Sequence, residues 1–288
     1  MNKLRFALFG AGRWGKNYLH LIANRADAEL VTVVTKSSGS ADAVWRDKSV
    51  DCVVIATPPA THLELTINAL SAGKHVLLEK PMALSVEDAE KLKTVTQKHK
   101  DKILMVGFQY IYNDYVRYLK KEIEKGYFGR IRMLKSEFRK MSTNREICIF
   151  WDAAPHPLSV FQYLFGFGQI EKYVGEINCN SASFTVNFAN KPTLSVKLYL
   201  FGNKKVRKFT LLGEKAGAIL DETLDKNKLT IMRGGKKIIP PIVAGRALKS
   251  ELDYFINCVQ NNKAPLTDFD FGAQVTELLE NIEFRLHK

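Results

Sequence analysis

A glycine-rich turn near the start of the chain constrains the fold more than any other feature. Three glycines follow an apolar run at residues 4–9 and precede a helical pattern at residues 14–24. In a G-x-G-x-x-G turn, the first glycine permits a tight bend, the second lets the backbone approach a pyrophosphate, and the third lets the helix pack closely on the strand. The helix N-terminus then supplies free N–H groups for phosphate. The motif predicts dinucleotide binding, with a ligand-free turn as the alternative, and its predicted cofactor-binding residues are Gly10, Gly12, Arg13, Trp14 and Gly15.

The first part of the chain alternates short apolar stretches with helical ones. Ser85, followed three residues later by Asp88, is typical of a helix N-terminus. Such alternation predicts an α/β fold, with a parallel sheet covered by helices and a Rossmann domain over residues 1–112. Strands are expected at residues 4–9, 30–34, 52–56, 75–78 and 103–107, and helices at residues 14–24, 61–72 and 86–100.

After about residue 113 the pattern becomes mainly that of strands with alternating apolar and polar side chains. This alternation predicts an α+β second domain, residues 113–288, with a mostly antiparallel open sheet. We expect it to bind substrate and to support a homodimer or homotetramer, with its C-terminal helices packing back on the first domain. Strands are expected at 130–138, 172–177, 181–188, 193–200, 206–212 and 229–233, and helices up to about 125, at 155–165 and from 248 onward.

Composition excludes several other classes of protein. No apolar run approaches the roughly 18 residues of a membrane span, so we expect a soluble, cytoplasmic chain that does not bind membranes. Its four cysteines are far apart and form no C-x-x-C pair, which argues against a zinc site or a disulfide framework, and we expect no bound metal.

The formal net charge of +13 favours an anionic partner. Recognised nucleic-acid-binding motifs are absent from the sequence, so we expect a small anionic molecule or a sugar as substrate, and no nucleic acid. The basic clusters at residues 204–208 and 236–237 are interpreted as solvated sheet edges.

The residues after the second strand bear on the choice of cofactor. An acidic residue at this point binds the adenosine ribose hydroxyls of NAD, but here the chain continues as Thr35-Lys36-Ser37-Ser38. Hydroxyls and an ammonium group suit a 2′-phosphate, so Thr35, Lys36 and Ser37 predict NADP, with NAD, or a solvated turn without a cofactor role, as the alternatives.

The connection that follows is short. A βαβ unit takes about 30 residues or more, yet only fifteen separate Thr35 from Asp51. A full helix, strand and helix cannot fit there, which predicts an unusually open adenine side of the pocket.

Four further motifs follow in order along the chain. They are Ala56-Thr57-Pro58-Pro59, Glu79-Lys80-Pro81, Gly107-Phe108, and Trp151-Asp152-Ala153-Ala154-Pro155-His156. With the glycine turn, they resemble the Gfo/Idh/MocA oxidoreductases, nicotinamide-dependent enzymes that oxidise sugar hydroxyls or reduce the matching ketones. The resemblance covers essentially the whole chain. Its motif context is similar to that of members found in bacterial polysaccharide and nucleotide-sugar pathways.

The resemblance implies roles for individual residues of the first domain. It places Thr57, Pro58, His62 and Glu79 along the cofactor, although a histidine in the first helical turn that supports the loop is the favoured interpretation of His62. It also implies that Lys80 contacts the nicotinamide region and donates to the substrate oxygen, with a cis Lys-Pro bond. An exposed lysine at a strand end is the alternative.

In the second domain, the resemblance implies that His156 exchanges the hydroxyl proton and that Asp152 orients it or the substrate. Prolines at 155 and 157 predict a helix that begins near Pro155 and ends at Gly166, with Asp152 and His156 four residues apart at its beginning. The predicted catalytic residues are therefore Lys80, Asp152 and His156.

The chain departs from the family at three positions near these residues. Pro157 stands where an acidic residue often follows the histidine, and Gln109 and Tyr110 replace the commoner Asn and Arg. Arg139 and Arg145 either bind substrate hydroxyls or phosphate or are ordinary surface residues. Predicted substrate contacts are Lys80, Gln109, Tyr110, Arg139, Arg145 and His156. A non-catalytic NAD(P)- or sugar-binding regulator on the same fold is the alternative function.

Overall fold

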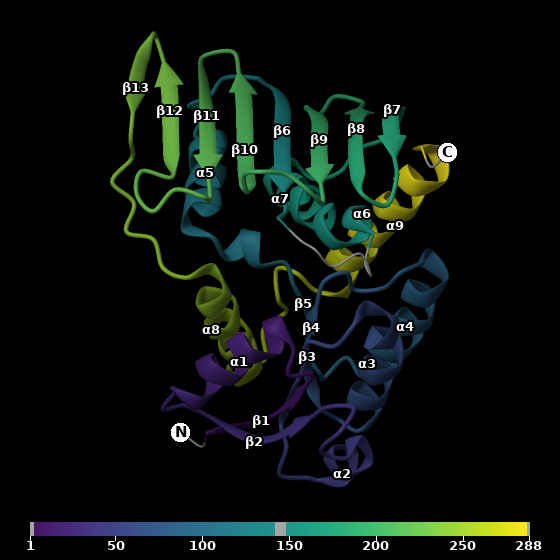
Figure 1. The fold of residues 1–288 in the computed structure, drawn as a ribbon. Helices are drawn as coiled ribbons and strands as arrows, with labels where there is room; N and C mark the ends of the chain where they lie inside the picture. Colours follow the sequence, from purple (N-terminus) through teal and green to yellow (C-terminus); the bar gives the residue numbers. More distant parts are fainter. Residues whose placement is uncertain (1–2, 142–147, 287–288) are drawn as a thin grey trace. The chain divides into compact units, whose positions relative to one another are not determined.

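The computed structural model describes residues 3–141 and 148–286 of the 288-residue chain (Figure 1). The chain forms two compact units. The first consists of residues 1–108 with 248–277, and the second of residues 109–247 with 278–288. The long last helix, α9 (Phe269–Leu286), contributes its first part to one unit and its second part to the other.

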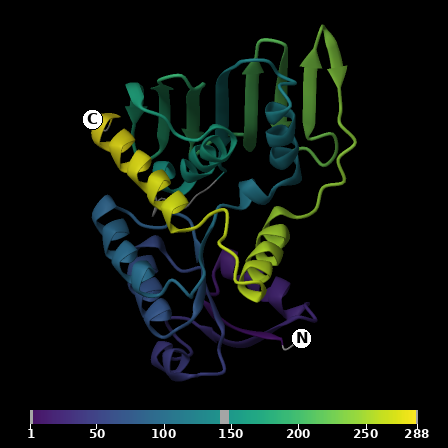
Figure 2. The ribbon, with the colours of Figure 1, turned by 180° about the vertical axis from the view of Figure 1, so that it is seen from behind.

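The first unit contains a five-stranded parallel sheet with strand order β2-β1-β3-β4-β5. Helices α1 and α8 cover one face and α3 and α4 the other, as both views show (Figures 1 and 2). The strands are β1 (Leu4–Phe9), β2 (Ala28–Val34), β3 (Cys52–Ile55), β4 (His75–Glu79) and β5 (Leu104–Gly107). The helices are α1 (Arg13–Ala23), α2 (Ala41–Arg46), η1 (Pro59–Thr61), α3 (His62–Ser71), α4 (Val86–Lys98) and α8 (Ala247–Gln260).

Burial on both faces explains why the central strands are continuous apolar runs. All four residues of β3, Cys-Val-Val-Ile, are fully buried, as are the three residues from Val76 to Leu78 in β4. Strands in a parallel sheet that is covered on both sides have this composition. The N-cap predicted at Ser85 is present, because its side chain accepts a hydrogen bond from the backbone N–H of Asp88 at 3.1 Å. The predicted α/β fold class is confirmed.

Within the described residues, the sheet lacks one strand of the common six-stranded Rossmann arrangement. That arrangement has the order 3-2-1-4-5-6, and here the position outside the second strand is empty, so β2 forms the edge. Between β2 and β3 the chain forms only the six-residue helix α2. The fifteen residues available there are too few for a further crossover unit.

The second unit contains an eight-stranded sheet with order β13-β12-β11-β10-β6-β9-β8-β7. All its strand pairs are antiparallel except β6 with β9. Helices α5, α6 and α7 lie on one face, which carries the buried residues of the alternating strands (Figure 2). The strands are β6 (Ile131–Arg139), β7 (Ile170–Ile177), β8 (Ser181–Phe188), β9 (Thr193–Tyr199), β10 (Val206–Gly213), β11 (Ala216–Asp221), β12 (Leu229–Arg233) and β13 (Lys236–Ile238). The helices are η2 (Gln109–Tyr112), α5 (Asp114–Glu124), α6 (Ile149–Ala153) and α7 (Pro155–Phe165).

The structure corrects three predictions in this unit. Strands β11 and β13 were not expected; each follows a turn that contains glycine, and β13 has only three residues. Asp152 does not lie on the helix that begins at Pro155 but on the preceding helix α6. Residues 206–208 belong to β10, which pairs with β11 and β6 and is therefore not a sheet edge; Lys208 forms an ion pair with Asp221 across the β10–β11 pair at 3.3 Å.

Residues 236–237 lie on β13, which is an edge strand. Within the two described ranges, no helix is long and apolar enough to cross a membrane.

Candidate functional site

The glycine turn after β1 has the geometry that a bound pyrophosphate requires. Gly10 has a φ of +90°, and a Cβ there would lie 2.6 Å from the carbonyl oxygen of Ala56. A Cβ on Gly15 would lie 1.8 Å from the carbonyl oxygen of Gly10, so the helix can approach the strand only without a side chain. Gly12 differs, because nothing lies within 4 Å of the position of its Cβ. The backbone at Gly12 is therefore open on the side from which a phosphate would approach.

The N-terminus of α1 strengthens this assignment. Gly12 is the N-cap of the eleven-residue helix and has no side chain to cap it. Its first turn contains no acidic residue, and both Arg13 and Gly12 are exposed. The free N–H groups and the helix dipole at this end favour an anion. The residues present therefore fit the pyrophosphate of a dinucleotide.

The turn after β2 is closed by its own hydroxyl groups. The Thr35 hydroxyl oxygen lies 2.8 Å from that of Ser38 and 3.3 Å from that of Ser37. The Thr35 N–H donates to the Ser38 carbonyl at 2.7 Å, and Gly39, with a φ of +77°, follows. Lys36, at the tip of this turn, is exposed. An ammonium group beside several hydroxyls matches the chemistry of a phosphate monoester.

Further loops gather at the same edge of the sheet. Strands β1, β3 and β4 are in register at their carboxyl ends, where Phe9 pairs with Ile55 and Ile55 with Leu78. The turns that follow these strands carry Gly12, the Thr57 loop and Lys80. Ligands of open parallel sheets bind at this edge.

His62 connects two of these loops. It is 1% exposed, with Nδ1 2.8 Å from the Pro81 carbonyl oxygen and Nε2 3.0 Å from the Thr57 carbonyl oxygen. Burial lowers the pKa of His62, and the charge of Lys80 acts in the same direction, while the backbone hydrogen bonds oppose the shift. A neutral imidazole donates only one of the two bonds. The ring therefore donates to one of the two carbonyl groups and packs against the other, and its direct contact with cofactor stays a prediction.

Thr57 and Pro58 lie in a loop that its own hydrogen bonds stabilise. The Thr61 hydroxyl lies 2.7 Å from the Thr57 hydroxyl and 2.8 Å from the Pro58 carbonyl oxygen. Pro58 is the N-cap of the short helix η1 and is exposed. Their contacts with a cofactor stay predictions.

The Glu79-Lys80-Pro81 segment ends β4 and contains the cis peptide bond between Lys80 and Pro81 that the resemblance implies. Glu79 and Lys80 are 8% and 9% exposed. The Lys80 N–H donates to Glu79 Oε2 at 3.2 Å. Burial raises the pKa of Glu79, and the charge of Lys80 opposes this shift. Lys80 is thus a nearly buried ammonium group next to a carboxyl group, and not the exposed lysine that was the alternative.

In the second unit, His156 lies between two aromatic rings. Its ring is T-shaped to Tyr110, with centroids 5.0 Å apart, and stacked on Phe138 at 5.8 Å. The imidazole is partly exposed, whereas Tyr110 is 5% and Phe138 4% exposed. Such ring contacts fix the orientation of a side chain, contributing about 0.5–1.5 kcal/mol each. Burial raises the pKa of Tyr110, so its hydroxyl stays neutral near physiological pH.

Asp152 forms an ion pair with Lys140, which follows β6. The helix containing Asp152 passes directly into the one containing His156, because Ala154 has helical dihedrals and caps both. Asp152 and His156 are thus four residues apart along nearly continuous helical backbone, as the sequence predicted, although across two helices.

The other predicted substrate contacts have different surroundings. Arg139 Nη2 donates to Glu137 Oε1 at 3.1 Å, and its guanidinium lies over the Tyr199 ring at 5.3 Å. Gln109 opens η2 and is partly exposed. Arg145 lies outside the described residues.

Sequence reasoning missed Tyr18, Glu251 and Lys140. Tyr18 and Glu251 are both fully buried in the first unit. A signal for Glu251 was present, because it lies three and four residues from Leu248 and Phe255 on the apolar stripe of α8, where a charged residue is unexpected. Tyr18 shares the buried stripe of α1 with Gly15 and Ile22. Lys140 had no distinguishing sequence context.

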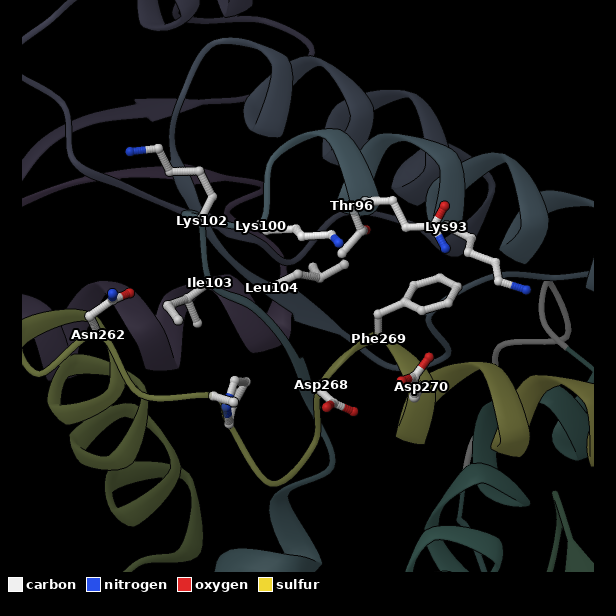
Figure 3. Close-up of a pocket in the computed structure, with 13 residues that line it drawn as sticks. Lys93, Thr96, Lys100, Lys102, Ile103, Leu104, Asn262, Asp268, Phe269 and Asp270 are labelled. Carbon is white, nitrogen blue, oxygen red and sulfur yellow. The ribbon is translucent and has the colours of Figure 1, made fainter.

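A surface pocket in the first unit lies at the other end of the sheet (Figure 3). It is lined by Ile103 and Leu104, at the start of β5, whereas the glycine turn follows the end of β1. Lys93, Lys100 and Lys102 lie across from Asp268 and Asp270. Asp268 has a structural role, since its carboxylate accepts from the Phe271 N–H at 3.0 Å where α9 begins. This pocket is therefore not the nucleotide site.

The fold and the glycine turn are those of a dinucleotide-binding Rossmann domain. Residues 4–108 match the Gfo/Idh/MocA model, described as an oxidoreductase family with an NAD-binding Rossmann fold. The match covers the Rossmann part of the first unit.

Several curated relatives are named dehydrogenases. One is the scyllo-inositol 2-dehydrogenase (NAD(+)) of Bacillus subtilis, 27% identical over 93% of this chain and 90% of the relative. Another is the inositol 2-dehydrogenase of Rhizobium meliloti, 31% identical over 57% of this chain and 55% of the relative. The glucose-6-phosphate 3-dehydrogenase of Bacillus subtilis is 30% identical over 51% of this chain and 45% of the relative. The chain thus spans about half the length of several of the curated relatives it matches.

Solved structures share the whole fold. The UDP-N-acetylglucosamine 3-dehydrogenase of Acidithiobacillus ferrooxidans superposes with a TM-score of 0.86, 22% identity and coverage of 99% of this chain and 98% of that one. The scyllo-inositol dehydrogenase of Lactobacillus casei has a TM-score of 0.84, 21% identity and coverage of 99% and 96%. At these identities the likeness shows the fold alone.

Proposed function

We propose that this protein is an NAD(P)-dependent oxidoreductase that acts on a hydroxyl or ketone group of a sugar or a sugar-like molecule. The observation that carries the proposal is the glycine turn, in which Gly10 and Gly15 exclude side chains and Gly12 leaves its phosphate-facing side open. Relatives named inositol and glucose-6-phosphate dehydrogenases support the class of substrate.

The cofactor is held by the loops at the carboxyl edge of the parallel sheet. Backbone N–H groups from Gly12 onward bind the pyrophosphate, and the turn after β2 binds the adenosine ribose. When bound, nicotinamide supplies or accepts the hydride. We assign the preference for NADP to Lys36 and the hydroxyls of Thr35 and Ser37, since no carboxylate follows β2 to bind a free ribose.

Three side chains act on the substrate in this proposal. Lys80 donates a hydrogen bond to the reacting oxygen and stabilises the charge that develops on it. His156, oriented by the Tyr110 and Phe138 rings, exchanges the proton of that oxygen. Asp152 orients His156 or the substrate, with Lys140 balancing its charge.

The substrate is a sugar or a small anion. The net charge of +13 favours a phosphorylated or nucleotide-linked sugar. Gln109 and Arg139 are the proposed contacts to its hydroxyl or phosphate groups. Arg139 requires an exchange of partners for this role, since Glu137 already accepts from it.

The test is a turnover assay with NADP and NAD against inositols, sugar phosphates and nucleotide sugars, read by absorbance of the reduced nicotinamide. We expect turnover with at least one of them, its loss in Lys80→Ala, and its retention in the control Lys98→Ala, a lysine on the last turn of α4. Tight cofactor binding with no turnover of any substrate would support the non-catalytic regulator instead.

A further inference from the structure

Three buried polar side chains meet beneath the Lys80 segment of the first unit. The hydroxyl oxygen of Tyr18, on α1, lies 3.0 Å from Oε1 of Glu79, at the end of β4, and 2.9 Å from Oε1 of Glu251, on α8. Tyr18 and Glu251 are 0% exposed and Glu79 is 8% exposed. Gly107, on β5, completes the enclosure, because a Cβ there would lie 3.4 Å from Glu251 Oε1 and 3.5 Å from the Tyr18 oxygen.

The number of protons in this cluster is limited. A phenol has one proton to donate, yet two carboxyl oxygens lie at hydrogen-bond distance from the same phenol oxygen. If both glutamates were ionised, one carboxylate would face the lone pairs of Tyr18, and two like charges would share a dry site. If one carboxyl group is protonated, it donates to Tyr18 and Tyr18 donates to the other. Both hydrogen bonds of the Tyr18 oxygen are then satisfied.

The surroundings of the two glutamates decide which of them keeps the proton. The titratable groups that act on the cluster are Tyr18 from α1, Glu79 and Lys80 at the end of β4, and Glu251 from α8. Burial raises the pKa of Glu79, but the Lys80 charge and the Lys80 N–H, 3.2 Å from Oε2, favour its ionised form.

Among the described groups, no cation acts on Glu251 in this way. Burial raises its pKa well above the ordinary value, and the charge of Glu79 raises it further. Its second oxygen, Oε2, has no hydrogen-bond partner among the described residues, which suits a neutral carboxyl group better than a carboxylate.

We propose that Glu251 is a neutral positioning residue, which donates to Tyr18 so that Tyr18 donates to ionised Glu79, and Glu79 thereby fixes Lys80. Glu251 does not contact substrate. It acts from α8 on Lys80 through two hydrogen bonds and one backbone contact. The catalytic consequence rests on the proposed function of Lys80, whereas the protonation state of Glu251 does not.

The protonation state is tested without substrate. Infrared difference spectroscopy of the wild type near neutral pH should show the carbonyl band of a protonated carboxyl group. The band should be absent from Glu251→Gln. It should remain in the matched control Glu280→Gln, which changes a glutamate of α9. No band in the wild type, or a band that persists in Glu251→Gln, would overturn the proposal.

The pH dependence of unfolding gives a second readout. A carboxyl group whose pKa is raised by folding binds its proton more tightly in the folded state. Its contribution to the free energy of unfolding therefore decreases as pH rises from the pKa of the unfolded state, about 4.3, towards the pKa of the folded state. The free energy of unfolding of Glu251→Gln should therefore decrease less with rising pH over this range than that of the wild type. Identical pH dependence would contradict a neutral Glu251.

The positioning role is tested by conservative rescue. Glutamine can still donate to Tyr18, so Glu251→Gln should keep kcat within about twofold, whereas Glu251→Leu and Tyr18→Phe should each lower kcat about tenfold. In the last two variants the alkaline limb of the kcat–pH profile should also move to lower pH, because Lys80 loses a fixed carboxylate.

A purely structural role would lower stability without moving that limb. Equal losses in Glu251→Gln and Glu251→Leu, or an unmoved limb in Tyr18→Phe, would contradict positioning. If the wild type turns over no substrate, the proposed function and the catalytic consequence fail together, while the infrared band still decides whether Glu251 is neutral.

Discussion

Gly15 packs so close to Gly10 that Gly15 cannot carry a side chain in this fold, and a side chain on Gly10 is excluded by the Ala56 carbonyl oxygen. A Cβ on Gly15 would lie 1.8 Å from the Gly10 carbonyl oxygen, which is backbone and cannot move aside. Gly12, between them, has nothing within 4 Å of its Cβ position. The fold thus requires glycine at positions 10 and 15, whereas at position 12 only a bound ligand would require it.

Alanine substitutions should separate these two requirements. We expect Gly15→Ala to lower the free energy of unfolding by about 3 kcal/mol or more, because α1 must move off β1. Gly12→Ala should leave the melting temperature nearly unchanged but weaken NADP binding about tenfold or more. Thermal unfolding and calorimetric titration measure both. Normal cofactor affinity in Gly12→Ala would argue against pyrophosphate at this turn.

The turn after β2 should set the choice between cofactors. We expect the wild type to bind NADP more tightly than NAD, by on the order of 1 kcal/mol or more, because Lys36 contributes a charge-assisted contact to the 2′-phosphate. Lys36→Asp should reverse the order, while Lys16→Asp, an exposed position on α1, should weaken both without reversing it. Equal wild-type affinities in a titration would remove this assignment.

Much of the first unit could be predicted from its sequence, because local patterns decide it. The strands are buried on both faces and read as apolar runs, and the glycine motif has one geometric solution. The missing strand beside β2 followed from counting residues between Thr35 and Asp51. The Lys80–Pro81 cis bond was implied by the resemblance alone.

What the sequence did not reveal depends on contacts between distant residues. Tyr18 and Glu251 are 233 positions apart and meet only when α8 packs beside α1. Lys140 follows β6 and Asp152 lies on α6, and the fold brings the two into an ion pair. The prolines predicted a helix that begins near Pro155, so the separate helix α6 was not expected. Strand β10 lies inside the sheet because β11, which the sequence did not reveal, pairs with it.

Asp152 should matter for turnover and not for cofactor binding. We expect Asp152→Asn to lower kcat strongly, because the carboxylate that orients His156 or the substrate is lost. The dissociation constant for NADP should stay within about twofold, because Asp152 is not among the residues of the pyrophosphate turn. Steady-state kinetics with calorimetric titration tests both parts, and a parallel loss of cofactor affinity would contradict the assigned role.

His62 should make the protein less stable in mild acid. Burial lowers its pKa in the folded protein. As pH falls through about 6.5, the histidine of the unfolded chain therefore binds a proton while the folded one stays neutral. The free energy of unfolding then decreases until the pH reaches the lower pKa of the folded state. Urea unfolding between about pH 7.5 and pH 5.5 should show a smaller loss in His62→Asn than in the wild type. The exposed His20→Asn is the control, and equal losses in all three proteins would contradict this assignment.

The central claim is that Lys80 and His156 act on one substrate oxygen, and a double-mutant cycle on kcat tests it most directly. With the best substrate of the panel, Lys80→Ala and His156→Ala should each lower kcat by about a hundredfold or more. Groups that serve one transition state act as a unit, so Lys80→Ala/His156→Ala should lose little more than either single variant. Losses that multiply in the double variant, or full activity in either single one, would contradict the account.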